Sequence, residues 1–210
     1  DYLEYTLDAL ILQTYQKLEI VIVDDGSVDG TPSIMTRKAS EDNRIKVFFP
    51  GRLGRAKALN YGLNQCHGEY VAVNDADDYS RHDRIEKQLA FMEKNPEVGL
   101  LGTAKEIHDG VMTWTDNVAT EDLIIRELFA HGQPIQHSSA MFRRIMMEKV
   151  GGYNEKISFL LDRDIFLRVG RISMIRQLNE PLIILNRTEN QYFKHRFNSF
   201  KRSWMSTKYQ

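Results

Sequence analysis

Short β-branched segments alternate with helical segments over the first 102 residues, and this alternation limits the possible folds more than any other feature of the chain. The predicted strands cover residues 18–23, 45–49, 70–73 and 98–102. The predicted helices, in which apolar residues recur at three- and four-residue spacings, cover residues 2–12, 32–40, 54–65 and 83–94. Strands that alternate with helices in this way typically form a mostly parallel sheet between helical layers. The predicted fold class is therefore a Rossmann-like α/β/α sandwich.

Beyond residue 102 the alternation is less regular. Helices are predicted over residues 121–129, 145–150 and 162–170, and strands over residues 138–142 and 181–186. No linker and no internal repeat divides this sequence. We therefore predict one domain over residues 1–186, with halves at 1–102 and 103–186, followed by a tail over residues 187–210.

Charge and cysteine content exclude several classes of protein. The chain carries 28 Lys and Arg against 29 Asp and Glu, so its net charge is −1. This balance argues against a generally basic nucleic-acid-binding protein, and no nucleic-acid partner is predicted. Cys66 is the single cysteine, which excludes an internal disulfide and a cysteine-cluster metal site. A reducing compartment, the cytoplasm, fits this content, and no apolar run approaches the ~20 residues that span a bilayer.

The tail over residues 187–210 has a composition of its own. It holds six Lys or Arg against one Glu, and several aromatic residues stand among these cations. Such a mixture suits peripheral contact with the anionic inner face of a membrane. The alternative is a helix that packs its aromatic side on the domain and leaves its cations in solvent.

Acidic residues follow two of the predicted strands directly. Asp24 and Asp25 follow residues 18–23, and Asp75, Asp77 and Asp78 follow residues 70–73. Ligands of open α/β sheets bind at the carboxyl ends of the strands, and carboxylates one residue apart suit a divalent cation that also binds phosphate oxygens. The alternative is that both clusters are turn or cap sequences. Mutual repulsion of so many carboxylates favours a cation site.

These segments resemble the family 2 glycosyltransferases, which are inverting enzymes with the GT-A fold. The resemblance rests on blocks in a fixed order: IVIVDDGSVDGT at residues 20–31, GRAKALNYG at 54–62, GEY at 68–70, NDADD at 74–78, HSSAMFR at 137–143, GGY at 151–153 and DRDIFLR at 162–168. It covers about residues 1–186. It implies a GT-A domain with a nucleotide-binding half over residues 1–102 and an acceptor half over residues 103–186. The family begins with a hydrophobic strand and a Pro-x-Tyr-Asn loop that are absent here, so we expect an N-terminally truncated sequence.

The resemblance also implies roles for individual residues of the nucleotide-binding half. Asp24 and Asp25 would contact the base and ribose of the donor, and Asp75 would lie by the ribose. Asp77 would ligate Mn²⁺ or Mg²⁺ at the diphosphate. Lys57 would approach the diphosphate, the alternative being a solvated charge on its helix.

In the acceptor half, His137 would line the donor pocket; the alternative is a structural histidine. Inversion requires a base that takes the proton of the acceptor hydroxyl, and Asp162 is the candidate. Leu161 stands where the family has a glutamate. Asp164 is the rival base, and Asp162 has the alternative role of a helix N-cap.

The predicted function follows from these roles. It is transfer of a sugar from a nucleotide-sugar donor, a UDP-sugar, to a hydroxyl of a glycan or lipid-linked sugar in polysaccharide or glycan biosynthesis. A sugar-nucleotidyltransferase is an alternative, although no Gly-rich phosphate loop is visible near the chain start. A non-catalytic nucleotide-binding fragment is a further alternative. A dehydrogenase is disfavoured because no Gly-x-Gly-x-x-Gly follows a strand.

Overall fold

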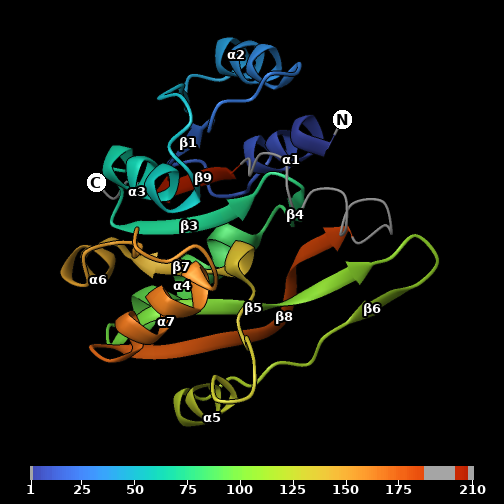
Figure 1. The fold of residues 1–210 in the computed structure, drawn as a ribbon. Coiled ribbons are helices and arrows are strands. Elements are labelled where there is room, and N and C mark those ends of the chain that lie inside the picture. The colour runs from blue at the N-terminus through green and yellow to red at the C-terminus, as the bar shows by residue number, and fades with distance from the viewer. Residues whose placement is uncertain (1, 187–201, 208–210) are drawn as a thin grey trace.

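A single mixed sheet organises the fold of this computed structural model, which describes residues 2–186 and the backbone of residues 202–207. The strand order is β2-β1-β9-β3-β7-β5-β8-β4, and β6 pairs with β5 (Figure 1). The strands are β1 (Leu18–Val23), β2 (Ile45–Phe48), β3 (Tyr70–Asp75), β4 (Asp78–Ser80), β5 (Val98–His108), β6 (Thr113–Thr115), β7 (Met141–Arg143), β8 (Met174–Asn186) and β9 (Arg202–Thr207). The helices are α1 (Tyr2–Ile11), α2 (Thr31–Glu41), α3 (Arg55–Gln65), α4 (Arg84–Lys94), α5 (Asp122–Leu128), α6 (Arg144–Lys149), α7 (Leu161–Gly170) and the 3₁₀ turn η1 (His137–Ser139).

The long strands run in one direction. β1 pairs in parallel with β2, and β5 pairs in parallel with β8. β9 is antiparallel to both β1 and β3, and β7 is antiparallel to both β3 and β5. It follows that β2, β1, β3, β5 and β8 share one direction, as the α/β prediction requires. The carboxyl ends of β1 and β3 therefore lie at the same edge of the sheet.

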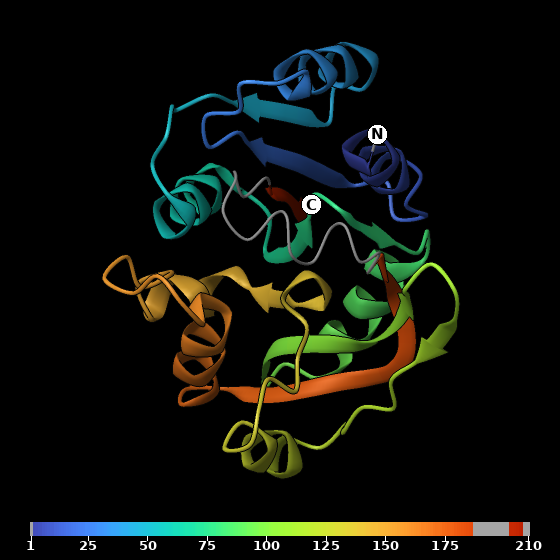
Figure 2. The ribbon, with the colours of Figure 1, turned by 45° about the vertical axis from the view of Figure 1, so that its right-hand side comes forward.

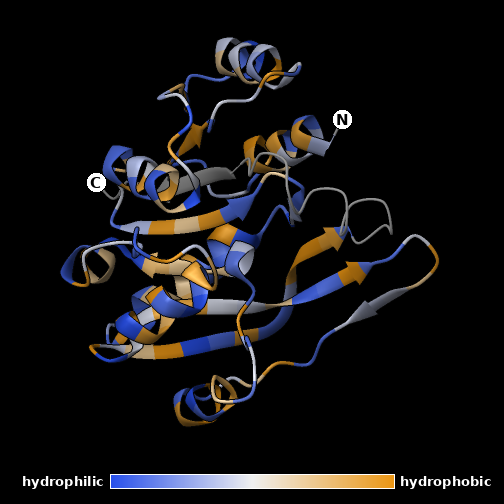
Figure 3. Cartoon of the chain, in the orientation of Figure 1, coloured by the Kyte–Doolittle hydropathy of each residue, from blue (hydrophilic) through white to orange (hydrophobic). Residues whose placement is uncertain are grey.

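Helices cover both faces of this sheet, as Figure 2 shows from the side. Successive residues of β1 enter opposite layers: Val21 and Val23 join the core under α3 and α7, whereas Ile20 and Ile22 join the core under α1, α2 and α4. Alternation of this kind buries every residue of β1. In Figure 3 the middle of β3 is hydrophobic and its carboxyl end is hydrophilic. The polar residues of this strand therefore lie at the carboxyl edge of the sheet.

The structure extends several predicted elements. The strand predicted over residues 98–102 continues to His108, and the strand predicted over 181–186 begins at Met174. These two strands pair along their whole length, with register shifts near Thr103 and Ala104. The predicted strand over residues 138–142 is instead η1 followed by β7. Polar residues break the apolar pattern in these extensions, so only the pairing partner reveals them.

The predicted tail falls mostly outside the described residues. Residues 202–207 form β9 between β1 and β3, and residues 187–201 and 208–210 are not described. Membrane contact by the tail stays a prediction, as does the boundary at residue 186. Within the described part of the chain, no helix has the length and apolar character needed to cross a bilayer.

Glu19 makes the stability of the folded state depend on pH in the acid range. It is buried in β1, where its carboxylate accepts hydrogen bonds from Lys46 Nζ at 2.8 Å and from the His67 N–H at 2.6 Å. Burial raises the pKa of Glu19, but these hydrogen bonds outweigh burial and lower the pKa from 4.5 to about 2. A lowered pKa means that this stabilisation is complete above pH 4.5 and is lost as the pH falls toward 2.

Glu19→Gln is therefore expected to flatten the acid limb of the stability profile. Between pH 6 and pH 3, the wild-type free energy of unfolding should fall by about 2 kcal/mol more than that of the variant. Urea unfolding at the two pH values measures this difference. The exposed Glu97 supplies the control, because Glu97→Gln should keep the wild-type pH dependence. Equal acid sensitivity in Glu19→Gln and wild type would contradict the assignment.

Candidate functional site

Asp24 lies directly after β1 and is buried, with 4% of its surface exposed. Its Oδ2 accepts the backbone N–H of Ser27 at 2.9 Å. Its Oδ1 is also buried and has no hydrogen-bond donor among the described residues. Buried polar atoms are almost always paired in folded proteins. The unmet oxygen thus fits a ligand N–H or O–H, as expected for a residue that contacts a nucleotide.

Asp25 connects the end of β1 to the beginning of α3. Its carboxylate accepts the backbone N–H groups of Leu53 at 2.5 Å and of Gly54 at 3.0 Å. Gly54 has a φ of +86°, in the region that glycine alone adopts readily. These bonds fix the segment that leads into α3. Lys57 is exposed in the first turn of this helix, and its contact with the diphosphate stays a prediction.

Asp75 and His137 meet at the end of β3, although 62 residues separate them in the chain. His137 lies in η1, and 2% of its surface is exposed. Its Nδ1 is 3.7 Å from Asp75 Oδ1, and its Nε2 is 2.8 Å from the hydroxyl oxygen of Tyr153. Its ring also contacts the ring of Phe166 in α7, with a centroid distance of 6.1 Å. Predicted site residues from both halves of the chain therefore share one neighbourhood.

The turn from Ala76 to Asp78 is held from α1 and from η1. Thr6 Oγ1 in α1 lies 3.0 Å from the Ala76 carbonyl oxygen and 3.2 Å from that of Asp78. Asp78 is buried, and the Ser138 hydroxyl donates to its carboxylate. Asp77, between them, is exposed. The turn thus presents a single outward carboxylate beside Asp75.

This arrangement suits a divalent ion bound jointly with phosphate. The described residues contain no group of three or more His, Cys, Asp or Glu side chains placed to hold a metal alone. Mg²⁺ commonly uses one or two carboxylates together with substrate phosphate oxygens, so Asp77, with Asp75 nearby, fits such an ion. Mn²⁺ accepts the same oxygen ligands.

Arg84, which the sequence analysis missed, lies beneath this turn. It is fully buried and donates to the Val73 carbonyl at 2.9 Å, to Asn74 Oδ1 at 3.1 Å and to Ser80 Oγ at 2.9 Å. Burial lowers the pKa of Arg84 to about 9, against the opposing charges of Asp78 and Asp75. The side chain therefore stays charged at neutral pH. The sequence did contain a signal for its burial. Arg84 and Gln88 stand four residues apart on a helix face that is otherwise apolar, and Arg84 donates to the Gln88 side chain at 2.9 Å.

The two candidate bases occupy different faces of α7. Asp164 accepts hydrogen bonds from Arg168 at 2.6 and 2.9 Å. Asp162 is half-buried, accepts the N–H of Arg163 at 3.0 Å, and has no cationic partner within the described ranges. It lies one helical turn before Phe166, the residue that contacts His137, and residues four apart share a helix face. The geometry thus favours Asp162 over Asp164.

The N-cap interpretation of Asp162 is not supported. The cap position of α7 belongs to Leu160, which makes no side-chain cap hydrogen bond, and Asp162 is the second residue of the helix. Leu160 has a φ of +53°, an unfavourable conformation for a branched apolar residue. The side chain of Leu161 is fully buried in the core, where the family's glutamate would be costly without a partner.

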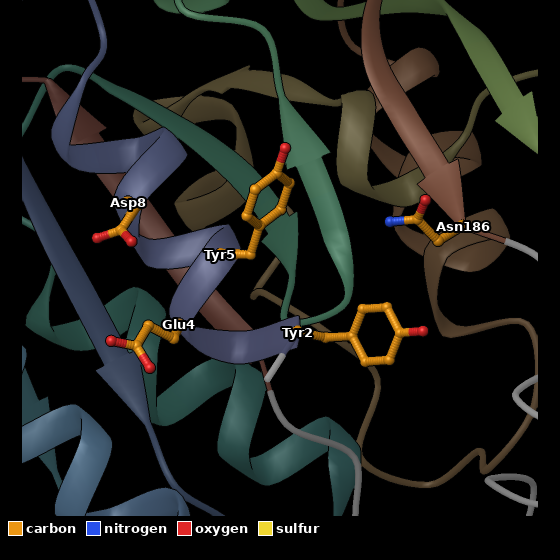
Figure 4. A pocket seen from close by; sticks show the side chains of 5 residues that line it. All are labelled: Tyr2, Glu4, Tyr5, Asp8 and Asn186. Carbon is orange, nitrogen blue, oxygen red and sulfur yellow. The ribbon is translucent and has the colours of Figure 1, made fainter.

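Two hollows in the described structure lie away from these residues. One, of about 650 Å³, is lined by residues of α1 and by Asn186 at the end of β8 (Figure 4). The other, of about 430 Å³, lies between α3 and the segment that contains α6 and Gly152. Neither is lined by a predicted site residue.

Comparison with known proteins decides the family. Residues 1–151 match the description "Glycosyl transferase family 2". The chain belongs to glycosyl transferase family 2. The resemblance seen in the sequence blocks is thereby confirmed.

The curated relatives that the chain matches are named glycosyltransferases. This family 2 chain is 32% identical over 169 residues to the amylovoran biosynthesis glycosyltransferase AmsE of Erwinia amylovora, covering 80% of this chain and 63% of that protein. It is 28% identical over 196 residues to an uncharacterized glycosyltransferase of Haemophilus influenzae, covering 87% of this chain and 60% of that protein. It is 41% identical over 93 residues to a putative teichuronic acid biosynthesis glycosyltransferase, TuaG, of Bacillus subtilis, covering 44% of this chain and 37% of that protein. The chain thus spans less than two thirds of the length of these relatives.

Solved structures establish the GT-A fold. S. aureus TarS 1–349 in complex with UDP-GlcNAc superposes with a TM-score of 0.75 at 19% identity, covering 94% of this chain and 58% of that chain. The mannosyltransferase PcManGT of Pyrobaculum calidifontis, in complex with GDP-Man and Mn²⁺, superposes with a TM-score of 0.67 at 24% identity, covering 92% of this chain and 55% of that chain. The fold predicted for the family 2 chain is confirmed by these similarities.

Proposed function

We propose that this chain transfers a sugar from a UDP-sugar to an acceptor hydroxyl, with inversion at the anomeric carbon. The observation that carries the proposal is the contact of Asp75 with His137 at the carboxyl edge of the sheet, beside the face of α7 that bears Asp162. Family membership and the nucleotide sugars bound by two structural relatives support a nucleotide-sugar donor. The polysaccharide names of AmsE and TuaG support a glycan or lipid-linked sugar as acceptor.

The donor would be held by acidic groups with separate tasks. The free Oδ1 of Asp24 accepts a hydrogen bond from the base or ribose, and Asp25 keeps the segment before α3 in place. Asp75 lies by the ribose and His137 closes the pocket from the acceptor half. Asp77 holds Mn²⁺ or Mg²⁺ beside the diphosphate. When bound, this ion stabilises the negative charge that develops on the departing nucleoside diphosphate.

The acceptor would be activated by Asp162. An inverting transfer is a single displacement, so the acceptor hydroxyl attacks the anomeric carbon from the side opposite the diphosphate. The carboxylate of Asp162 takes the hydroxyl proton as the new bond forms. Its freedom from a cationic partner within the described residues leaves it available as a base.

Release of nucleoside diphosphate tests this function directly. A panel of UDP-, GDP- and dTDP-sugars is incubated with Mn²⁺ and a mixed-glycan acceptor, with and without EDTA. We expect release from a UDP-sugar that EDTA abolishes. Binding of UDP without turnover of any donor would favour a non-catalytic binding role instead.

Asp77→Ala is expected to remove the metal-dependent part of donor binding. Loss of the one exposed carboxylate of the turn should weaken UDP affinity in Mn²⁺ at least about tenfold, because a metal ligand is lost. Calorimetric titration of UDP with Mn²⁺ and with EDTA measures this effect. Asp83→Asn is the control, since Asp83 pairs with Lys87 at 2.6 Å outside the turn. Unchanged affinity in Asp77→Ala would remove this residue from the site.

A further inference from the structure

We propose that Tyr153 is a positioning residue, which fixes the ring of His137 against Asp75 and thereby prepares the donor site. This inference rests on the proposed function, because it assigns a purpose to the His137 contact. Tyr153 follows the Gly151–Gly152 pair in the acceptor half. It is almost fully buried, with 2% of its surface exposed.

The hydrogen-bond pattern assigns one orientation to the imidazole. Nδ1 of His137 faces the Asp75 carboxylate at 3.7 Å, and Nε2 lies 2.8 Å from the Tyr153 hydroxyl oxygen. A neutral imidazole has one donor nitrogen and one acceptor nitrogen. We assign the proton to Nδ1, on the side of the carboxylate, and in this tautomer Nε2 is the acceptor and the Tyr153 hydroxyl donates. Removal of that hydroxyl takes away the 2.8 Å hydrogen bond at Nε2, which is one of the contacts that hold the ring in place.

The backbone of Tyr153 is itself fixed to the nucleotide-binding half. The Asn60 side chain in α3 donates to the Tyr153 carbonyl at 2.9 Å and accepts the Tyr153 N–H at 2.7 Å. Gly152 has a φ of +69°, and a Cβ there would lie 2.6 Å from Asn60 Oδ1. Glycine is therefore required for the close approach of this loop to α3. The chain of contacts runs from α3 through Tyr153 and His137 to Asp75.

A matched pair of hydroxyl deletions separates positioning from simple packing. Tyr70 is equally buried, and its hydroxyl oxygen accepts a hydrogen bond from Arg143 Nη1 at 2.8 Å at the opposite end of β3. Tyr153→Phe and Tyr70→Phe each remove one buried hydroxyl and keep the ring. Both should lower thermal stability to a similar degree.

Only Tyr153→Phe should change the site. UDP affinity in Mn²⁺ should fall about three- to tenfold, the size expected for one lost hydrogen bond. The donor KM should rise by a similar factor with a smaller change in kcat. In a His137→Gln background, Tyr153→Phe should have no additional effect, because the two residues act through one contact. Tyr70→Phe should leave UDP affinity and KM at wild-type values.

Nitrogen-15 NMR of the His137 ring gives a readout that is independent of turnover. The Nδ1-protonated tautomer with a hydrogen-bonded Nε2 is expected in the wild type, and in Tyr153→Phe the Nε2 resonance should shift because the nitrogen no longer accepts the tyrosine hydroxyl. Wild-type UDP affinity in Tyr153→Phe, with weakened affinity in His137→Gln, would overturn the inference and leave the proposed function intact. Absence of UDP binding by the wild type would overturn the proposed function, and an unchanged His137 Nε2 resonance in Tyr153→Phe would overturn positioning separately.

Discussion

Asp162→Asn is expected to lower kcat by roughly 10²–10⁴ while UDP affinity in Mn²⁺ stays at the wild-type value. The amide keeps the size of the carboxylate and the oxygen that accepts the Arg163 N–H, so α7 should keep its structure. It cannot take a proton from the acceptor hydroxyl at neutral pH. The lost rate therefore reports the base alone.

Asp164→Asn provides the matched control two residues away. This change removes the ion pair with Arg168, which is partly exposed, and should lower kcat by less than about tenfold. Steady-state release of nucleoside diphosphate from the donor that the panel identifies measures both variants. A large loss in Asp164→Asn together with near-normal turnover in Asp162→Asn would reverse the assignment of the base.

Arg84→Met is expected to lower the free energy of unfolding by about 3–5 kcal/mol, the largest effect on stability that we predict. The thioether fills part of the space but donates no hydrogen bond. The Ser80 hydroxyl oxygen and the Val73 carbonyl then each lose the hydrogen bond from Arg84, Asn74 Oδ1 keeps the bond from the Ser80 hydroxyl but loses that from Arg84, and the buried charge of Asp78 loses its nearby cation. Unmet buried polar groups and uncompensated buried charge both destabilise the folded state.

Arg143→Met tests whether loss of a partly buried arginine, which likewise donates to backbone carbonyls, would have this effect. Arg143 donates to the carbonyls of Val98 and Met92 at the opposite end of β3, and its exposed partner Glu69 needs no buried countercharge. Its loss should cost less than that of Arg84 in urea unfolding at pH 7. Equal losses for the two variants would contradict the charge argument for Arg84.

The sequence predicted the sheet core well because burial on both faces leaves an unbroken apolar run. β1 shows this directly, since its alternate residues enter two cores. The polar halves of β5 and β8 could not be predicted, because their strand character depends on pairing with each other. The acidic residues of the candidate site could be predicted because they stand directly after apolar strands, and the carboxyl ends of such strands are where ligands of α/β sheets bind.

The contacts of the site were harder to predict than its residues. Spacing shows that Asp162 and Asp164 occupy different faces of a helix, but the packing of Phe166 against His137, on which the proposal of Asp162 rests, is a tertiary contact that spacing does not reveal. Arg84 was missed because an arginine in a surface-type helix is normally solvated. Its burial depends on acceptors from Val73, Asn74 and Ser80, whose joint position only the folded turn provides.

The place of β7 affects how the chain can fold as it is synthesised. β3 and β5 are not neighbours in the sheet, because Met141–Arg143 lies between them. A nascent polypeptide therefore leaves the ribosome with a gap between β3 and β5 until residue 143 has emerged from the exit tunnel, and a second gap, between β1 and β3, lasts until β9 has emerged. Until these partners arrive, the edges of β1, β3 and β5 expose unpaired backbone hydrogen-bonding groups, so a chaperone that covers strand edges would assist this chain during synthesis.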